Sequence, residues 1–138
     1  CVVLCHSVLA PISGMVLFSD TDSAQYKAAC WIMFDDKRRL SAYNFSLVQR
    51  YVSAVLYYAT NGRNWDDDVQ FLDEESECNW KGLNCTESNE VFEIDFMNNN
   101  LRGNLISEIG WLRKLQYLDL SHNKLQGTIP RQFGALLE

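Results

Sequence analysis

The sequence predicts an α/β solenoid with a helical cap ahead of its repeats, and two observations carry this prediction. Residues 91–114 and 115–138 repeat one another at a constant offset of 24 residues, and periods of roughly 20 to 50 residues are typical of stacked arrays. Residues 46–60 place apolar side chains at helical spacing, which predicts an amphipathic helix. We therefore divide the chain into an N-terminal extension at 1–45, a cap at 46–90 and two repeats at 91–138.

The two repeats carry the same kind of residue at matching positions. The matching pairs are Val91 and Leu115, Ile94 and Leu118, Phe96 and Leu120, Asn99 and Asn123, Leu101 and Leu125, Gly103 and Gly127, Leu105 and Ile129, Ile109 and Phe133, Gly110 and Gly134, and Leu112 and Leu136. Leu118 and Leu120 alternate with polar neighbours, which is the period-two pattern of a strand with one buried face. One repeat cannot bury that face alone, so neighbouring repeats must stack.

The asparagines and glycines of the repeats have separate predicted roles. Asn99 and Asn123 follow the strand where the chain turns away, and their amides can satisfy backbone groups that the turn leaves unpaired. Stacked copies of this residue predict an asparagine ladder. Gly103 and Gly127 permit the tight backbone of the return leg.

The helix at the start of the cap has recognisable ends. Asn44 or Ser46 can cap its N-terminus, because short polar side chains accept hydrogen bonds from the unpaired N–H groups there. The Asn-Gly pair at 61–62 is a stop signal. A second helix is predicted over residues 23–34, and it is the one helix that we expect in the N-terminal extension.

The first fifteen residues are apolar but too short to span a bilayer, and His6, Pro11 and Gly14 interrupt them. We expect a packed helix or arm there, and the alternative is the tail of a signal or anchor segment. No membrane span is expected elsewhere in the chain. The first residue is Cys1 rather than Met, so we expect that the true start of the protein precedes it.

Composition excludes several classes of function. An apolar fraction of 47% and a charged fraction of 22% indicate a globular protein. A net charge of −6 argues against a nucleic-acid partner, since phosphate binding depends on clustered Lys and Arg. The five cysteines lack the paired spacing of a zinc site. Sequons at Asn44 and Asn84 predict glycosylation and fit a secreted chain, although sequons also arise by chance.

Four motifs point to one family. They are Leu118-Asp119-Leu120-Ser121-His122-Asn123, Gly127-Thr128-Ile129-Pro130, Tyr57-Tyr58-Ala59-Thr60-Asn61-Gly62 followed by Trp65, and Cys78-x-Trp80-x-Gly82-x-x-Cys85. Together they resemble the plant-type leucine-rich repeat with its N-terminal cap. Residues 11–14 and 25–28 are similar to caps of algal receptor-like members. The resemblance covers most of the chain, and it is looser over the first forty residues.

The resemblance implies a right-handed arc with a parallel sheet on its concave face. It also implies a disulfide between Cys78 and Cys85, with two reduced thiols of a cytosolic protein as the alternative. The pairing of Cys1, Cys5 and Cys30 stays open. The chain departs from the family pattern at Leu105-Ile106, where Ile-Pro is usual. It also has two repeats where a stable array needs about three, so we expect a fragment of a longer product or a degenerate remnant.

The family resemblance further implies protein or peptide recognition by an extracellular or cell-surface receptor-like protein that is sometimes membrane-anchored. Two alternatives remain: a structural repeat module without a ligand of its own, and an ectodomain piece of a receptor kinase. The candidate ligand-binding residues are the outward-facing strand positions Glu93, Asp95, Met97, Tyr117, Asp119 and Ser121. Their three carboxylates favour a basic ligand, and the alternative is that this patch contacts nothing.

Other chemistry is not expected. His6 and His122 lack the nucleophile and acid that an active site needs, so no enzyme, catalytic residue or cofactor is predicted. The acidic runs at 66–68 and 73–75 lack the ligand spacing of a calcium loop, and no metal is predicted. Trp65 and Trp80 are expected in the core of the cap, packed on Val55 and Leu83, with carbohydrate stacking as the alternative.

Overall fold

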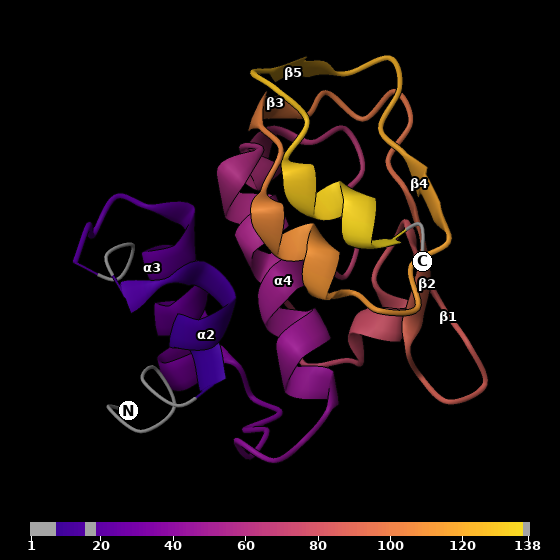
Figure 1. Ribbon diagram of the computed structural model, residues 1–138. Coiled ribbons are helices and arrows are strands. Elements are labelled where there is room, and N and C mark those ends of the chain that lie inside the picture. Colours follow the sequence, from indigo (N-terminus) through magenta and orange to yellow (C-terminus); the bar gives the residue numbers. More distant parts are fainter. Residues whose placement is uncertain (1–7, 16–18, 137–138) are drawn as a thin grey trace.

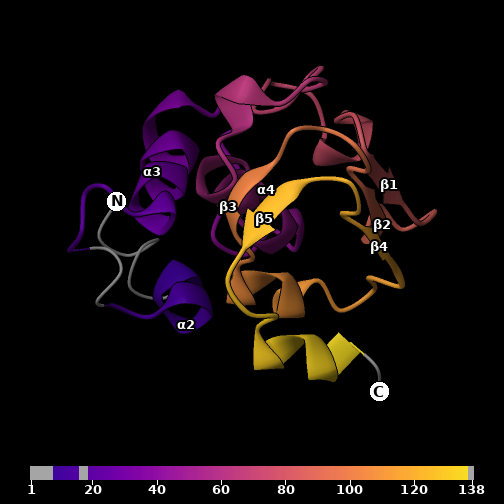
Figure 2. The same ribbon diagram turned by 90° about the horizontal axis from the view of Figure 1, so that it is seen from above.

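The computed structural model describes residues 8–15 and 19–136. The long helix α4 (Ser46–Ala59) lies at the centre, with the short helices α2 (Ala10–Ser13) and α3 (Ala24–Cys30) on one side and the strands on the other (Figure 1). The view from above shows the same order of layers (Figure 2). No described helix is both long and apolar enough to cross a membrane.

Local polar contacts fix the ends of α4. The Oδ1 atom of Asn44 accepts a hydrogen bond from the backbone N–H of Ser46 at 2.9 Å, so Asn44 provides the side-chain cap. At the other end Asn61 adopts the left-handed conformation, with φ of 60°, which Asn tolerates better than most residues. Because neighbours cover α4 on both sides, even Gln49 and Arg50 are buried.

The helix expected over residues 23–34 forms in two segments. Ser23 caps α3, because its Oγ atom accepts a hydrogen bond from the backbone N–H of Tyr26 at 3.1 Å. After Cys30 the chain continues as a π-helical segment, Trp31–Asp35, which buries Trp31 and Ile32.

A short helix, α2, precedes α3. It confirms the packed helix or arm expected within the first fifteen residues, so the extension has a helix besides the one predicted over residues 23–34. Pro11 lies in the first turn of α2, where a missing N–H costs nothing. Gly14 ends α2 with φ of 81°. Leu9 and Ile12 are buried in the common core. Pro11 and Gly14, which interrupt the apolar stretch at the start of the chain, therefore mark the beginning and the end of a short helix.

The main sheet holds three strands in the order β1 (Leu83–Cys85), β2 (Val91–Asp95) and β4 (Tyr117–Asp119). β2 and β4 are parallel, with Ile94 opposite Leu118, as the 24-residue offset predicts. β1 is antiparallel to β2 and was not expected from the sequence.

The return strands β3 (Arg102–Asn104) and β5 (Lys124–Gln126) form a second, parallel pair. Gly103 lies opposite Leu125 and not opposite Gly127, so the 24-residue offset does not describe this pair. β3 is tied to the end of α4, where the N–H of Arg102 donates to the carbonyl of Thr60 at 3.0 Å. A Cβ atom on Gly103 would collide with the carbonyl oxygen of Ala59, so close packing on α4 requires glycine there.

The two repeats differ in how deeply their apolar side chains are buried. The strand-face and turn residues of the first repeat are fully buried: Ile94, Phe96 and Leu101. Their counterparts in the second repeat are only half-buried: Leu118, Leu120 and Leu125. Ile129 is 75% exposed. The second repeat therefore presents an apolar end face.

A buried ion-pair network, which the sequence analysis missed, centres on Arg50. The guanidinium donates to both carboxylate oxygens of Asp36 at 2.8 Å and to Oε2 of Glu77 at 3.4 Å. It also donates to the carbonyls of Asp73 at 2.6 Å and Glu75 at 2.7 Å. All five of its N–H groups therefore have acceptors.

The same guanidinium lies over two neighbouring indole rings, 5.0 Å from the ring centroid of Trp31 and 4.7 Å from that of Trp80. Asp36 and Trp31 belong to the N-terminal extension, whereas Glu77 and Trp80 belong to the cap. Arg50 thus joins the extension and the cap in one core.

Trp65 and Trp80 are buried, at 6% and 1% exposure, so neither indole is available to stack on a sugar. Val55 and Leu83, the neighbours expected from the sequence, belong to the same core cluster. The ring contacts of Trp65, however, are with the aromatic residues Tyr57, Phe71 and Phe96, at centroid distances of 4.8 to 5.2 Å. The core of the cap is therefore largely aromatic.

Candidate recognition surface

The disulfide implied by the cap motif is present in the structure. Cys78 and Cys85 are bonded, with their Cα atoms 5.4 Å apart. Cys85 is the last residue of β1, so the disulfide holds this strand against the turn that precedes it. Cys30 is a half-exposed free thiol, while Cys1, Cys5 and His6 lie outside the described residues.

The six candidate ligand-binding residues lie along β2 and β4 and just beyond them. Glu93 is opposite Tyr117, and Asp95 is opposite Asp119. Asp95, Met97, Asp119 and Ser121 are exposed, Tyr117 is 60% exposed, and Glu93 is half-buried. The ring of Tyr117 meets that of Phe92 edge-on, with centroids 6.3 Å apart. The structure thus brings all six residues onto one outward face.

Two turns of the same kind end these strands. Oδ1 of Asp95 accepts a hydrogen bond from the N–H of Met97 at 3.0 Å, and Oδ1 of Asp119 accepts one from the N–H of Ser121 at 2.9 Å. The pKa of Asp119 lies below its usual range, mainly because the Ser121 side chain donates a hydrogen bond to the carboxylate and then because the Ser121 backbone does so. Both side chains are therefore held in place.

The carboxylates of Asp95 and Asp119 belong to one rung of the sheet, and adjacent strands are about 4.8 Å apart. Like charges directly opposite each other destabilise a sheet. A cation placed between the two side chains would remove this repulsion, so the geometry favours a basic group as ligand.

Asn99 and Asn123 form the asparagine ladder. Oδ1 of Asn123 accepts from the backbone N–H groups of Asn99 at 3.1 Å and Leu101 at 2.9 Å. Its Nδ2 atom donates to the carbonyl of Phe96 at 2.6 Å. Asn99 makes the corresponding pair of bonds to the N–H and carbonyl of Asp67, at 2.6 and 2.9 Å. These side-chain amides hold in place the turns that follow β2 and β4.

The two sequon asparagines occupy different settings. Asn84 lies on β1, opposite Glu93, and its Nδ2 atom donates to Oε2 of Glu93 at 2.9 Å. Asn44 caps α4 through Oδ1. Asn84, Glu93 and Tyr117 therefore form one rung across all three strands, and the sequence analysis had not placed Asn84 on this surface.

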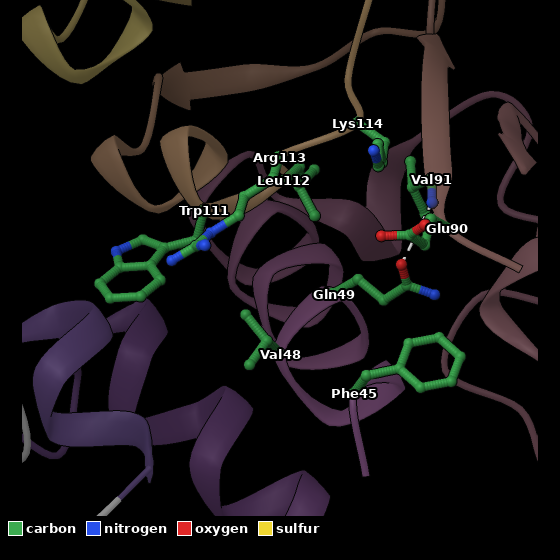
Figure 3. Close-up of a pocket in the computed structure, with 9 residues that line it drawn as sticks. All are labelled: Phe45, Val48, Gln49, Glu90, Val91, Trp111, Leu112, Arg113 and Lys114. Atoms are coloured by element: carbon green, nitrogen blue, oxygen red, sulfur yellow. Dashed lines mark hydrogen bonds between the residues drawn. The ribbon is translucent and has the colours of Figure 1, made fainter. Parts of the chain in front are cut away.

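A second surface feature, which we call the cap groove, lies between the start of α4 and the turn before β4 (Figure 3). Its volume is about 290 Å³. The lining comprises Phe45, Val48, Gln49, Glu90, Val91, Trp111, Leu112, Arg113 and Lys114. A candidate signal for it in the sequence is Trp111, because the second repeat has alanine at the matching position, 135.

The acidic run at 66–68 and His122, which were weighed for metal or catalytic chemistry, lie in loops and turns. Within residues 8–15 and 19–136 no group of three or more His, Cys, Asp or Glu side chains could hold a metal ion. In the acidic run at 66–68, the backbone of Asp67 bonds to the side chain of Asn99. His122 occupies a turn with φ of 57°. Both features serve the turns of the solenoid.

Comparison with known proteins agrees with the repeat geometry. The family model described as Leucine Rich Repeat matches residues 114–136, the segment that contains β4 and β5. This segment is a leucine-rich repeat. The strands before it, β2 and β3, pair in parallel with β4 and β5, so the solenoid includes both repeats.

Several of the curated relatives that match the chain are plant receptor kinases or receptor-like proteins. It is 45% identical over 60 residues to the leucine-rich repeat receptor-like tyrosine-protein kinase PXC3 of Arabidopsis thaliana, covering 43% of this chain and 7% of the kinase. It is 41% identical over 54 residues to the nodulation receptor kinase of Pisum sativum, covering 37% and 6%. Receptor-like protein 5 of Arabidopsis thaliana is 42% identical over 59 residues, covering 43% and 22%.

The matched parts are thus a small fraction of the length of these relatives. Among solved structures, the chain is similar to the crystal structure of PEPR1-AtPEP1, with a TM-score of 0.49 and 30% identity over 66% of this chain and 13% of the other. It is also similar to the BIR3–SERK2 complex from Arabidopsis thaliana, with a TM-score of 0.44 and 26% identity over 59% and 49%.

Proposed function

We propose that this leucine-rich repeat chain is a recognition module of an extracellular or cell-surface receptor-like protein, and that it binds a protein or peptide ligand through its outward strand face. The observation that carries the proposal is the rung in which Asp95 and Asp119 lie opposite each other beside the exposed ring of Tyr117. Exposed side chains on rigid parallel strands are the means by which solenoids recognise partners.

The charge of this face indicates the class of ligand. Asp95 and Asp119 are exposed carboxylates on neighbouring strands, and Glu93 lies one rung away. A basic peptide would complement them, and an aromatic side chain such as Tyr117 is a frequent anchor in interfaces. We assign no catalytic step to the chain, because the kinases among its relatives match it over only 6–7% of their length.

The organisation of the chain supports the same proposal. We infer an N-terminal extension at 1–45, a cap at 46–90 and two repeats at 91–138, with the extension sharing the core of the cap through Arg50. The disulfide between Cys78 and Cys85 fits an oxidising compartment. Asn44 and Asn84, the proposed glycosylation sites, fit the same compartment.

Peptide binding tests the ligand proposal. We would compare two pools of eight-residue peptides, one with a net charge of +3 and one with −3, on the wild-type chain. The basic pool should bind more tightly, and Asp95→Asn with Asp119→Asn should weaken it by about tenfold. A matched double variant, Asp22→Asn with Glu87→Gln, alters the net charge equally away from the strand face and should bind like wild type.

Equal binding of the two pools, or equal loss in both double variants, would refute a specific acidic strand face. A chain that binds neither pool would act as a structural repeat module without a ligand of its own. The compartment is tested by non-reducing peptide mapping of the secreted protein. Recovery of Cys78 and Cys85 as two alkylated free thiols would contradict the extracellular assignment.

A further inference from the structure

We propose that the cap groove is a second, independent docking site, and that it takes an acidic segment of a partner protein with an apolar side chain beside its carboxylates. The groove joins elements far apart in the sequence, because Phe45 directly precedes α4 and Val48 lies in its first turn, while Trp111 to Lys114 precede β4. Figure 3 shows the side chains of both segments around one hollow.

The floor of the groove is apolar and its rim is aromatic. Val91 and Leu112 are buried beneath it, whereas Phe45 is 62% exposed and Trp111 is 38% exposed. A volume of about 290 Å³ is close to the lower limit of roughly 300 Å³ for small-ligand sites. The floor can therefore receive a large apolar side chain, but not a folded partner element.

The positive charge on the rim of the groove favours a partner with a negative charge. Arg113 and Lys114 are adjacent and exposed, and neither side chain has an ion-pair or hydrogen-bond partner within the described part of the chain. A carboxylate would bind Arg113 in a bidentate manner, which is the strongest common hydrogen-bonded ion pair in proteins.

Gln49 and Glu90, the polar residues of the groove besides the two cations, decide at which end a carboxylate of the partner would bind. The side-chain amide of Gln49 already has partners for all its groups. It donates to Oε1 of Glu77 and to the carbonyl of Asn89, and it accepts from the N–H of Val91. Glu90 is the single acid of the lining. In Figure 3 it lies on the side of Lys114, while the Arg113 guanidinium points toward Trp111. An incoming carboxylate therefore favours the Arg113 end.

The cation-bearing turn is preorganised by its own backbone. The N–H of Arg113 donates to the carbonyl of Trp111 at 3.0 Å, and the N–H of Leu115 donates to the carbonyl of Leu112 at 2.9 Å. Little conformational entropy is lost on binding when the receptor is already ordered. The groove also differs in sign from the acidic strand face, so one ligand chemistry cannot account for both sites.

The fluorescence of Trp111 reports on the groove, because the other three tryptophans, Trp31, Trp65 and Trp80, are at most 6% exposed. The probes are two acetylated hexapeptides with a central Phe, flanked by two Glu in one and by two Gln in the other. The Glu peptide should change Trp111 emission with an affinity at least about tenfold higher than the Gln peptide.

The variant Arg113→Glu should remove this preference, whereas Arg63→Glu, an equal charge change at another exposed site, should retain it. Circular dichroism checks that both variants are folded. The proposal is overturned if the two peptides act equally on the wild-type chain, if neither acts, or if Arg63→Glu loses the preference as well. The acidic strand face is tested with basic peptides, so the two proposals fail separately.

Discussion

Oδ1 of Asn123 accepts a hydrogen bond from the backbone N–H of Asn99, one repeat earlier in the chain, at 3.1 Å. Asn99 in turn bonds to the backbone of Asp67 in the cap, at 2.6 and 2.9 Å. The loop at Asp67 therefore occupies the place that a preceding repeat would occupy. The cap presents the same backbone groups to the first repeat as the first repeat presents to the second.

The ladder predicts a clear result for Asn123→Ala. The substitution leaves the N–H groups of Asn99 and Leu101 and the carbonyl of Phe96 without their partner. We expect a loss of about 1–3 kcal/mol in the free energy of unfolding, measured in urea. Hydrogen exchange should accelerate at Asn99 and Leu101 first.

The control for that experiment is Asn123→Asp, which keeps the acceptor but replaces the donor to Phe96. It should preserve protection at Asn99 and Leu101 while still losing stability. Equal exchange rates in wild type and Asn123→Ala would show that the ladder does not hold these turns.

Arg50→Met tests the network between the extension and the cap. The substitution leaves Asp36 as a buried carboxylate without its guanidinium, whereas Glu77 keeps its ion pair with Arg38 at 3.0 Å. Removing one partner of a buried ion pair costs about 3–5 kcal/mol, and we expect a loss of that size in urea unfolding. Arg50→Lys should also destabilise the protein, because an ammonium cannot make the bidentate bond to Asp36.

Lys37→Ala is the matched control, because Lys37 forms an exposed salt bridge with Glu74 at 3.0 Å. Exposed pairs contribute at most about 1 kcal/mol. If Lys37→Ala and Arg50→Met destabilised the protein equally, the buried network would have no special structural role.

Periodicity explains why much of this structure could be predicted from sequence. The alternation around Leu118 and the fixed offset to Ile94 predict two parallel strands in register, and the structure has them. The predicted helix from Ser46 to Thr60 differs from α4 by one residue. These signals are local or repeat within the chain, so one sequence contains them.

Contacts between distant residues that do not repeat were missed. Arg50 bonds to Asp36 and Glu77, 14 and 27 residues away, and no spacing rule links them. Asn84 was recognised as a sequon but not as a strand residue opposite Glu93, because β1 has only three residues. Neither feature produces a periodic pattern in the sequence.

Asp119 predicts a pH dependence. Because hydrogen bonds from Ser121 lower its pKa in the folded state, ionised Asp119 favours folding at pH values above the ordinary Asp range. This contribution is lost as the pH falls through the lowered folded-state pKa. Ser121→Ala should move the pKa of Asp119 upward, toward its ordinary value, in a carbon-13 NMR titration. No movement would mean that the side-chain hydroxyl does not bind the carboxylate.

The apolar end face predicts an effect of added repeats. Ile129 is 75% exposed, and Leu118 and Leu125 are half-buried, unlike their counterparts in the first repeat. Each such side chain gains roughly 1.5–3 kcal/mol when fully buried. Extending the chain by two consensus repeats and a polar cap should raise the midpoint of thermal unfolding and reduce self-association.

Calorimetry and light scattering compare the two forms. The prediction is contradicted if residues 1–138 are already monomeric and unfold cooperatively at the temperature of the extended chain. A version extended by a polar segment of equal length, without repeats, separates burial of the end face from a general effect of length.

The direction of β1 has a consequence for how the solenoid is assembled. β1 runs against β2, whereas β4 runs with it, so the parallel stacking of strands begins at β2 and continues to β4. The disulfide between Cys85 and Cys78 holds the antiparallel strand β1 in place. Its pairing with β2 therefore fixes the first rung of the sheet.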